Sequence, residues 1–422
     1  MKPDAKKSIT RDLWEVSCAV KPVPETGWFE GTHNLACDSS HYFMPSEPGR
    51  KFDDLLKRLL VQQGWSEKYS EEYLKELLYD LCRVVIRTAQ QDELAQSFQR
   101  CVTDYETYDC NQTVHVLLSG IRLQAEFRLG GLTLKSLTVD DKKELVKQLE
   151  TIVSQQPQSE QRLQVKEFVK QNVLERFEGK VCAVFTTLAE PKRAKQKTQE
   201  RCACVLDLLR YAIPALYPRS AEVRVGFDGE LWRFASPIPI VSSDNSQFSI
   251  QWLEMGPVFP MEISQETIQS LEEIGVLRLG KALEKQACQR SEFETVLLRG
   301  VHWFANAQLP LEKATQFLSL VTCLESFLCP KDRDPISTSV AEGVALVLGE
   351  NLDNRRRLKR KVKELYGIRS AITHSGLETV LDVDLETLRN IALALTSALI
   401  KRADDFSKQQ DLLDWIEDKK LS

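Results

Sequence analysis

Residues 365–376 read LYGIRSAITHSG, and their apolar spacing predicts a helix with an arginine inside its apolar stripe. With Leu358 as the origin and about 100° per residue, Leu365 and Ile372 fall within roughly 40° of one line. Arg369 falls at about 20°, inside the same stripe. A guanidinium stays charged at any ordinary pH, and an unpaired one in a dry core is strongly destabilising. Either a carboxylate meets Arg369, or that face of the helix lines a site.

The composition of the whole chain is that of an ordinary globular protein. Its 422 residues are enough for two or three domains, and 42% are hydrophobic and 28% charged. The net charge of −5 argues against a general coating of nucleic acid, although a local basic patch is compatible with it. The N-terminus has no apolar signal segment, and the apolar run at 391–400 is too short to cross a bilayer. Eleven cysteines at irregular spacing predict reduced thiols, so we expect a cytoplasmic protein without a membrane partner.

The patterns along the chain predict an α+β protein, with a mixed α/β domain at 1–284 and an all-α helical bundle at 285–422. The first 50 residues are rich in Pro, Gly and Ser, which predicts irregular or short-stranded structure. Helical spacing follows from 51 to about 100. Apolar and polar residues then alternate over 121–129, which predicts one strand with one buried face, and Gly130-Gly131 predicts a tight hairpin after it.

The middle of the chain alternates between further helices and strands. Asp141 and Glu144 have the spacing of a capping box that opens a helix, and Pro214 is expected to end a later helix. We predict a polar linker at 154–161, a buried strand at 181–188 and a helix at 192–211. Two or three strands are expected within 222–255, and only helices from 265 onward.

Two helices of the C-terminal part carry the candidate site. The first, at 311–328, has an apolar stripe with Glu325 at its edge. The second, at 354–373, carries Arg369 and ends at His374, and Gly376 is suited to the left-handed cap that follows. This second helix also holds seven lysines and arginines between positions 355 and 363, a basic face able to bind phosphates. The residues of this face that we take as candidates are Arg355, Arg356, Lys359 and Lys363.

These motifs resemble the HEPN superfamily. Arg369 and His374, with four residues between them, fit its R-x(4–6)-H signature, and ELYGIRSAITHSG resembles "lYklRskivHG" of the Apea-like branch. FLSLVTCLESFL at 317–328 and AEGVALVLG at 341–349 resemble two other helices of that branch, so the likeness covers roughly 285–405. GIRLQAEFRLGGLTL and RAKQKTQE upstream resemble, more loosely, the α/β domain that often precedes it.

The resemblance implies a helical bundle that dimerises and places both Arg–His pairs at the interface, and many family members are metal-independent ribonucleases. It therefore implies an RNA endonuclease that cuts through the RNA 2′-OH without a cofactor, with RNA such as tRNA as substrate. The catalytic residues would be Arg369, which offers a fork to phosphate oxygens, and His374, which moves protons. Glu325, Tyr366 and Ser370 would support them. Ser370 departs from the family, in which Asn, Asp or His is common at that position.

The same analogy gives the chain a biological role, a conditional toxin in antiviral defence whose N-terminal domain answers a trigger ligand or protein. The alternative is a non-catalytic HEPN dimer that binds RNA or a nucleotide, or acts as a scaffold. In that case Arg369 is a core arginine neutralised by Glu325, His374 caps the helix end, and the basic run is a solvated face. A weaker alternative, pairing with a nucleotidyltransferase antitoxin, has no nucleotidyltransferase motif in this chain to support it.

Other motifs in the sequence give weaker indications of function. His33, Cys37 and His41 have metal-ligand spacing for a helix, but their segment is a poor helix former and lacks a fourth ligand. Cys202 and Cys204 are interpreted as packing residues. The P-loop, HExxH, G-x-S-x-G and G-x-G-x-x-G motifs are absent from the sequence, which argues against ATPase, zincin, α/β-hydrolase and dinucleotide-binding functions.

Overall fold

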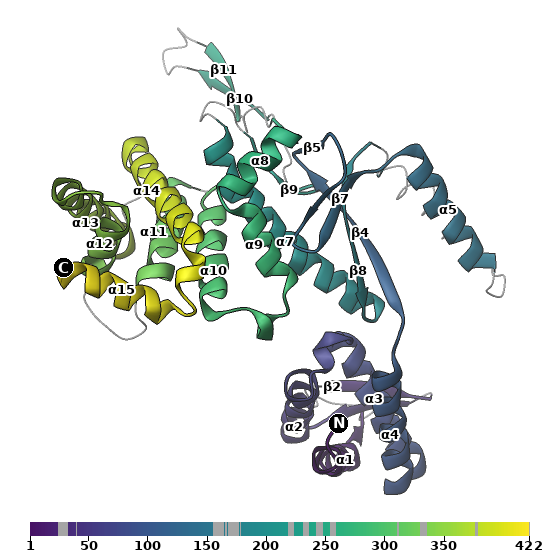
Figure 1. Cartoon of the computed structure of the whole chain (residues 1–422). Helices are drawn as coiled ribbons and strands as arrows, with labels where there is room; N and C mark the ends of the chain where they lie inside the picture. The colour runs from purple at the N-terminus through teal and green to yellow at the C-terminus, as the bar shows by residue number, and fades with distance from the viewer. Residues whose placement is uncertain are drawn as a thin grey trace. The chain divides into compact units, whose positions relative to one another are not determined.

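The computed structural model has a mixed α/β fold in which helix predominates over strand (Figure 1). The chain forms two compact units, one of residues 1–114 and 185–199 and one of residues 115–184 and 200–422. The predicted boundary at 284/285 lies inside the second unit. The structure describes the chain except for residues 24–32, 39, 155–163, 165–166, 168–176, 178, 218–222, 231–235, 242–247, 254–258, 310–311, 330–335, 376–378 and 422. The predicted linker, apart from Ser154, and the glycine of the predicted cap thus lie outside the described residues.

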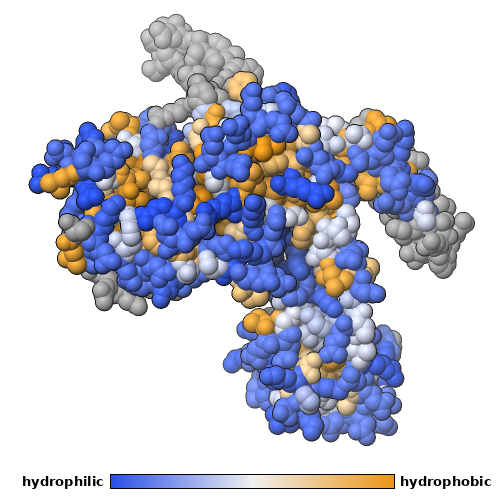
Figure 2. Space-filling view, in the orientation of Figure 1, coloured by the Kyte–Doolittle hydropathy of each residue, from blue (hydrophilic) through white to orange (hydrophobic). Residues whose placement is uncertain are grey.

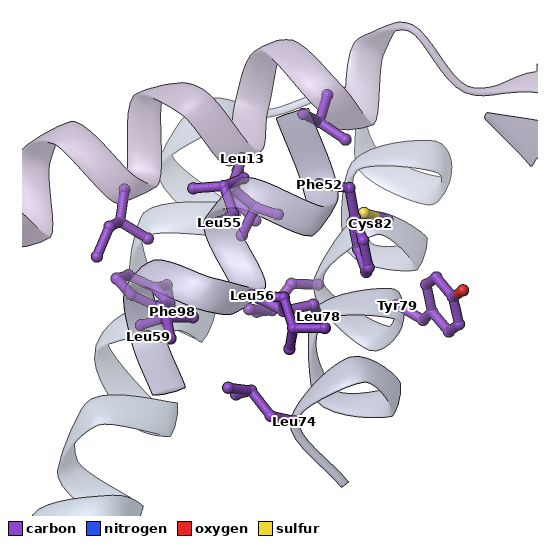
Figure 3. Packing of buried hydrophobic residues seen from close by; sticks show 14 of the residues in the cluster. Leu13, Phe52, Leu55, Leu56, Leu59, Leu74, Leu78, Tyr79, Cys82 and Phe98 are labelled. Carbon is purple, nitrogen blue, oxygen red and sulfur yellow. The ribbon is translucent and has the colours of Figure 1, made fainter. Parts of the chain in front are cut away.

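Four helices enclose the hydrophobic core of the first unit (Figure 3). Leu13, Phe52, Leu56, Leu78 and Phe98 come from all four and are each at most 4% exposed. The helices are α1 (Pro3–Cys18), α2 (Ser46–Lys57), α3 (Glu71–Thr88) and α4 (Gln91–Thr107), and α2 continues as a π-helical turn, Arg58–Gln62. The helical prediction for 51–100 is confirmed.

Helix α1 corrects the prediction for the first 50 residues. Ile9, Leu13 and Val16 are spaced four and three residues apart, so they share one face of a helix and are buried on it. Pro3 stands in the first helical turn, where a missing N–H removes no hydrogen bond. The count of Pro, Gly and Ser over a long window concealed this shorter periodic segment. Strand structure is present after it, as a small antiparallel sheet of β1 (Lys21–Pro22), β3 (Ser40–Met44) and β2 (His33–Cys37), in that order.

Residues 185–199 complete the first unit through the buried carboxylate of Glu190. This side chain is 4% exposed and accepts hydrogen bonds from the backbone N–H groups of Ser70, Lys192 and Arg193, at 3.1, 2.8 and 2.7 Å. The backbone N–H of Glu190 in turn donates to the carbonyl of Lys68 at 2.8 Å. One acidic residue therefore satisfies the open N–H groups at the beginnings of α3 and of α7 (Pro191–Leu216).

A five-stranded sheet has the order β6-β7-β8-β4-β9 (Figure 1), and most of its residues belong to the second unit. Its strands are β4 (Asn111–Ser119), β6 (Phe127–Leu129), β7 (Leu132–Ser136), β8 (Val181–Leu188) and β9 (Gly226–Phe227). Two strand pairs accompany it, β5 (Ile121–Leu123) parallel to β12 (Met261–Ile263) and β10 (Ser236–Val241) antiparallel to β11 (Phe248–Leu253). The strands predicted at 181–188 and within 222–255 are confirmed.

The predicted single strand at 121–129 is wrong, because the chain bends at 124–126 and divides it into β5 and β6. Ala125 was expected on the buried face but is exposed, and its small side chain gains little from burial. The two halves pair with different strands, β12 and β7. The hairpin after them is confirmed, with Gly130 and Gly131 both at positive φ, 60° and 79°.

Two helix ends also differ from the prediction. Helix α5 (Val139–Ser154) begins three residues earlier than expected, because Thr138 and Asp141, rather than Asp141 and Glu144, form the capping box. The Thr138 hydroxyl accepts from the Asp141 N–H at 3.2 Å, and the Asp141 carboxylate accepts from the Thr138 N–H at 2.9 Å. Pro214 does not end α7, which runs on to Leu216. In the last turn proline removes one hydrogen bond, a loss that a long packed helix tolerates.

From residue 265 onward the described residues form helices and no strands, as predicted. Helix α10 packs against α11 and α14, and α12 packs against α13, α14 and α15. The core between them includes Phe293, Phe304, Phe317 and Phe327, all fully buried. Gly300 permits the close packing, since a Cβ there would lie 2.0 Å from the Phe327 ring. The helices are α8 (Gln265–Glu273), α9 (Val276–Glu284), α10 (Glu292–Asn306), α11 (Lys313–Leu328), α12 (Ile336–Leu348), α13 (Leu352–Ser375), α14 (Asp382–Lys401) and α15 (Gln409–Leu421).

In the described part of the chain, none of the helices has the length and apolar character needed to span a bilayer. The molecular face drawn in Figure 2 is mostly hydrophilic, with hydrophobic residues in separate patches.

Candidate functional site

Helix α13 carries Arg369 on the side that faces the bundle. Val362 and Leu365, on the same stripe, are at most 1% exposed, whereas the Arg369 side chain is 35% exposed. Its Nη2 atom lies 3.9 Å from Oε1 of Glu325 on α11. The structure thus confirms the predicted carboxylate opposite Arg369, but at the outer limit of an ion pair and with a third of the arginine open to solvent.

A tyrosine hydroxyl shares the same carboxylate oxygen. Tyr366 is 8% exposed and donates a hydrogen bond from its hydroxyl to Oε1 of Glu325 at 3.2 Å. Burial, together with the Glu325 charge, raises the pKa of Tyr366 far above its usual range, so the hydroxyl stays protonated and remains a donor. Burial and the same carboxylate raise the pKa of the Cys329 thiol to about 11, so this cysteine is not an activated nucleophile.

His374 does not join this cluster within one chain. Helix α13 stays regular through Ser375, so the distortion of its last turn that would bring His374 to Arg369 is not observed. Five residues along a regular helix correspond to about 140° of rotation and about 7.5 Å of rise. The His374 side chain is exposed, and in the described structure neither a hydrogen bond nor an ion pair connects it to Arg369 or Glu325. Ser370, also exposed, lies between the two in sequence.

Of the four candidate residues on the predicted basic face, two contact other residues of the bundle and two are exposed to solvent. The Arg355 guanidinium donates to the carbonyl of Gly349 at 3.2 Å, and Lys359 pairs with Glu342 at 2.7 Å. Arg356 and Lys363 are exposed. Two of the four candidates are therefore used in packing the bundle, and two face solvent.

Known proteins offer no guide to this site. Searches against family models, curated proteins and solved structures return no match. The chemistry available to the site therefore follows from its own geometry. That geometry consists of a partly exposed guanidinium held by Glu325 and Tyr366, and an exposed imidazole one and a half turns further along the helix.

The His33, Cys37 and His41 motif does not form a metal site. His33 and Cys37 are buried on β2, whereas His41 is exposed on β3. The Nδ1 atom of His33 lies 2.9 Å from the Tyr79 hydroxyl, and Nε2 lies 3.2 Å from an Asp53 oxygen without hydrogen-bond geometry. Burial lowers the pKa of His33, although Asp53 opposes this effect. Across the described residues, no three histidine, cysteine or acidic side chains come together as metal ligands.

A polar network between α7 and α10, centred on the buried Asp207, was not predicted from the sequence. Asp207 is 8% exposed, and one of its oxygens lies 2.7 Å from Nδ1 of His302. Its other oxygen lies 3.6 Å from the Arg210 guanidinium, which also pairs with Glu230 at 3.1 Å. Burial raises the pKa of Asp207, although the contacts with His302 and Arg210 lower it. Asp207 and Arg210, three residues apart inside the apolar run VLDLLRYAI, could have indicated a buried ion pair. Nothing in the sequence indicated that His302, 95 residues away, contacts Asp207.

Proposed function

We propose that this protein is a metal-independent RNA endonuclease of the HEPN type, built from an N-terminal α/β part and a C-terminal helical bundle that dimerises. The observation that carries the proposal is the state of Arg369. In the alternative, a core arginine neutralised by Glu325, the side chain would be buried and tightly paired, whereas Arg369 is 35% exposed and 3.9 Å from the carboxylate. Such a guanidinium is oriented by the protein yet free to meet a phosphate.

The proposed reaction needs two protein groups. The RNA 2′-OH attacks the adjacent phosphorus, the 5′-oxygen of the next nucleotide leaves, and the product ends in a 2′,3′-cyclic phosphate. The proton of the 2′-OH passes to solvent water as its oxygen bonds to phosphorus. Arg369 meets the negative charge that develops on the phosphoryl oxygens, and His374 supplies a proton to the leaving oxygen. Positioned proton transfer of this kind typically contributes about 10²–10⁴-fold to rate. The reaction requires no metal or cofactor.

The helix geometry favours a site made by two copies of the chain. Arg369 and His374 lie on different faces of α13, about 140° apart, so one chain cannot direct both at one phosphate. In a two-fold symmetric dimer, Arg369 of one copy and His374 of the other can converge. Dimerisation is then a condition of activity.

The remainder of the chain is proposed to control the nuclease, as a conditional toxin in antiviral defence in the cytoplasm. A trigger would act within residues 1–284. A cavity in this part is lined by Arg122, Tyr217, Phe259 and Glu262, and so combines aromatic and charged groups that suit a small ligand.

The first test is cleavage of total RNA and of tRNA in the presence of EDTA. Wild type should release fragments ending in a 2′,3′-cyclic phosphate, and His374→Ala and Arg369→Ala should not. His41→Ala is the matched control, because it removes another exposed histidine. Full activity in either site variant would overturn the proposal.

Mixing the two inactive variants tests the shared site. Half of the dimers in an equal mixture carry one copy of each variant, and each of these has one site with both native residues. We therefore expect about a quarter of wild-type activity to return. No return of activity, with mixed dimers demonstrated, would mean that each chain makes its own site.

The alternative function is a non-catalytic HEPN dimer that binds RNA or serves as a scaffold. Ser370 and the wide separation of His374 from Arg369 favour it. Tight RNA binding by folded, dimeric wild-type protein without cleavage, with and without cell extract as a source of trigger, would support this alternative.

A further inference from the structure

One face of α13 carries an exposed row of residues that ends at His374. The residues are spaced four, three, four, three and four apart, so they lie along a single line of the helix. The row consists of Arg356, Arg360, Lys363, Gly367, Ser370 and His374, all exposed. It has three cations in its first half, small residues in the middle and the imidazole at its end.

The cations of this row make fewer ion pairs with carboxylates of the chain than the two lysines on the other faces of α13. Lys359 and Lys361, on other faces, pair with carboxylates at 2.7 and 3.1 Å. In contrast, neither Arg360 nor Lys363 has an ion-pair partner among the described residues, and Arg356 has only an exposed one at 3.8 Å. Like charges three and four residues apart destabilise a helix, so nothing within the chain explains this row.

Gly367 is equally unexplained by the fold. Glycine in a helix interior is less stable than alanine, and it is tolerated where something must approach the backbone closely. A Cβ at Gly367 would have no atom within 4 Å, so no neighbour in this chain requires the glycine. Residues that lower the stability of a helix, and make no compensating contact within the chain, are characteristic of functional surfaces.

We propose that this row is the path of a single RNA strand, with its phosphates on Arg356, Arg360 and Lys363 and its backbone passing close over Gly367 to the scissile position at His374. The inference rests on the proposed function and adds the substrate class, unpaired RNA. A row one side chain wide matches one strand, and its length from Arg356 to His374 is about 27 Å. It contains no large apolar side chain of the kind that a membrane-binding helix inserts.

The test compares two charge-removing double variants in the non-cleaving His374→Ala protein. Arg360→Gln with Lys363→Gln removes two cations from the row. Arg357→Gln with Lys361→Gln removes an arginine and a lysine from another face of the same helix. Binding of a labelled single-stranded oligouridylate is measured by fluorescence anisotropy over a range of salt concentrations. Loss of two phosphate contacts should reduce the slope of log K against log salt by about 1.4 in the first variant and leave it unchanged in the second.

The outcomes separate the two proposals. If the His374→Ala protein binds no RNA even at low salt, the proposed function fails. If it binds RNA but both double variants lose the same slope, only the strand path is wrong.

Gly367→Leu gives an independent check. Leucine is the better helix former, so the helix should be at least as stable, while its side chain blocks the close approach. We expect weaker RNA binding by a dimer that remains intact in analytical ultracentrifugation. Unchanged RNA binding, or loss of the dimer, would overturn the assignment.

Discussion

Replacing Arg369 by alanine separates a catalytic arginine from a structural one. Loss of exposed ion pairs changes stability by about 0.2–1 kcal/mol, and breaking buried ones by about 3–5 kcal/mol. Arg369 and Glu325 are 35% and 21% exposed, they are 3.9 Å apart, and Glu325 keeps the hydrogen bond from Tyr366. We therefore expect Arg369→Ala to reduce the free energy of unfolding by about 1–2 kcal/mol, between the two classes.

The partner tyrosine provides the control. Tyr366→Phe removes a hydrogen bond to a charged group, which is worth about 1.5–3 kcal/mol, and leaves Arg369 in place. The double variant leaves Glu325 without either partner. It should therefore be less stable than the sum of the single losses, by at least about 0.5 kcal/mol.

Urea unfolding followed by circular dichroism measures these losses, and RNA cleavage is measured on the same samples. We expect Arg369→Ala to abolish cleavage in a protein that remains folded at assay temperature. A loss of about 3–5 kcal/mol would instead identify a core ion-pair residue. Normal cleavage by a folded Arg369→Ala protein would remove Arg369 from the catalytic site.

Three further predictions test the fold around the site. Gly300→Ala places a methyl group against the Phe327 ring, so we expect a loss of about 1–3 kcal/mol by urea unfolding, and wild-type stability would show that the ring moves freely. Because burial lowers the pKa of His33 in the folded state, the unfolded state binds the proton more readily. The free energy of unfolding by urea should therefore fall as pH drops below about 6.5, and a His33→Gln variant should lose that dependence. His302→Ala breaks a 2.7 Å contact to Asp207 but removes a half-exposed side chain, so a loss of about 1 kcal/mol is expected, and no loss would mean that solvent replaces the imidazole fully.

The C-terminal helices were predictable because their apolar spacing agrees with their burial. The predicted helices at 311–328 and 354–373 are observed as Lys313–Leu328 and Leu352–Ser375. Phe317, Val321 and Leu324 are buried as their stripe required. The same periodicity placed Arg369 inside the apolar stripe, and a contact with Glu325 was one of the two alternatives it left open. Local spacing is sufficient here, since each helix presents one continuous apolar face to the bundle.

Features that depend on distant pairing could not be predicted. The parallel pairing of β5 with β12 joins residues 140 positions apart, and it is why the alternating segment divides at Ala125. The contact of Asp207 with His302 likewise depends on how α7 meets α10. Whether Arg369 and His374 converge within one chain depends on the conformation of the helix end, which residue spacing does not record.

The position of Glu190 in the sequence has a consequence for biosynthesis. Its carboxylate completes hydrogen bonding at the start of α3, yet it is synthesised 76 residues after residue 114. At about 5–20 residues per second, this delay is about 4–15 s. Strands β5 to β7 of the second unit are synthesised within that interval. The N-terminal unit therefore reaches its final form only after part of the next unit has been made.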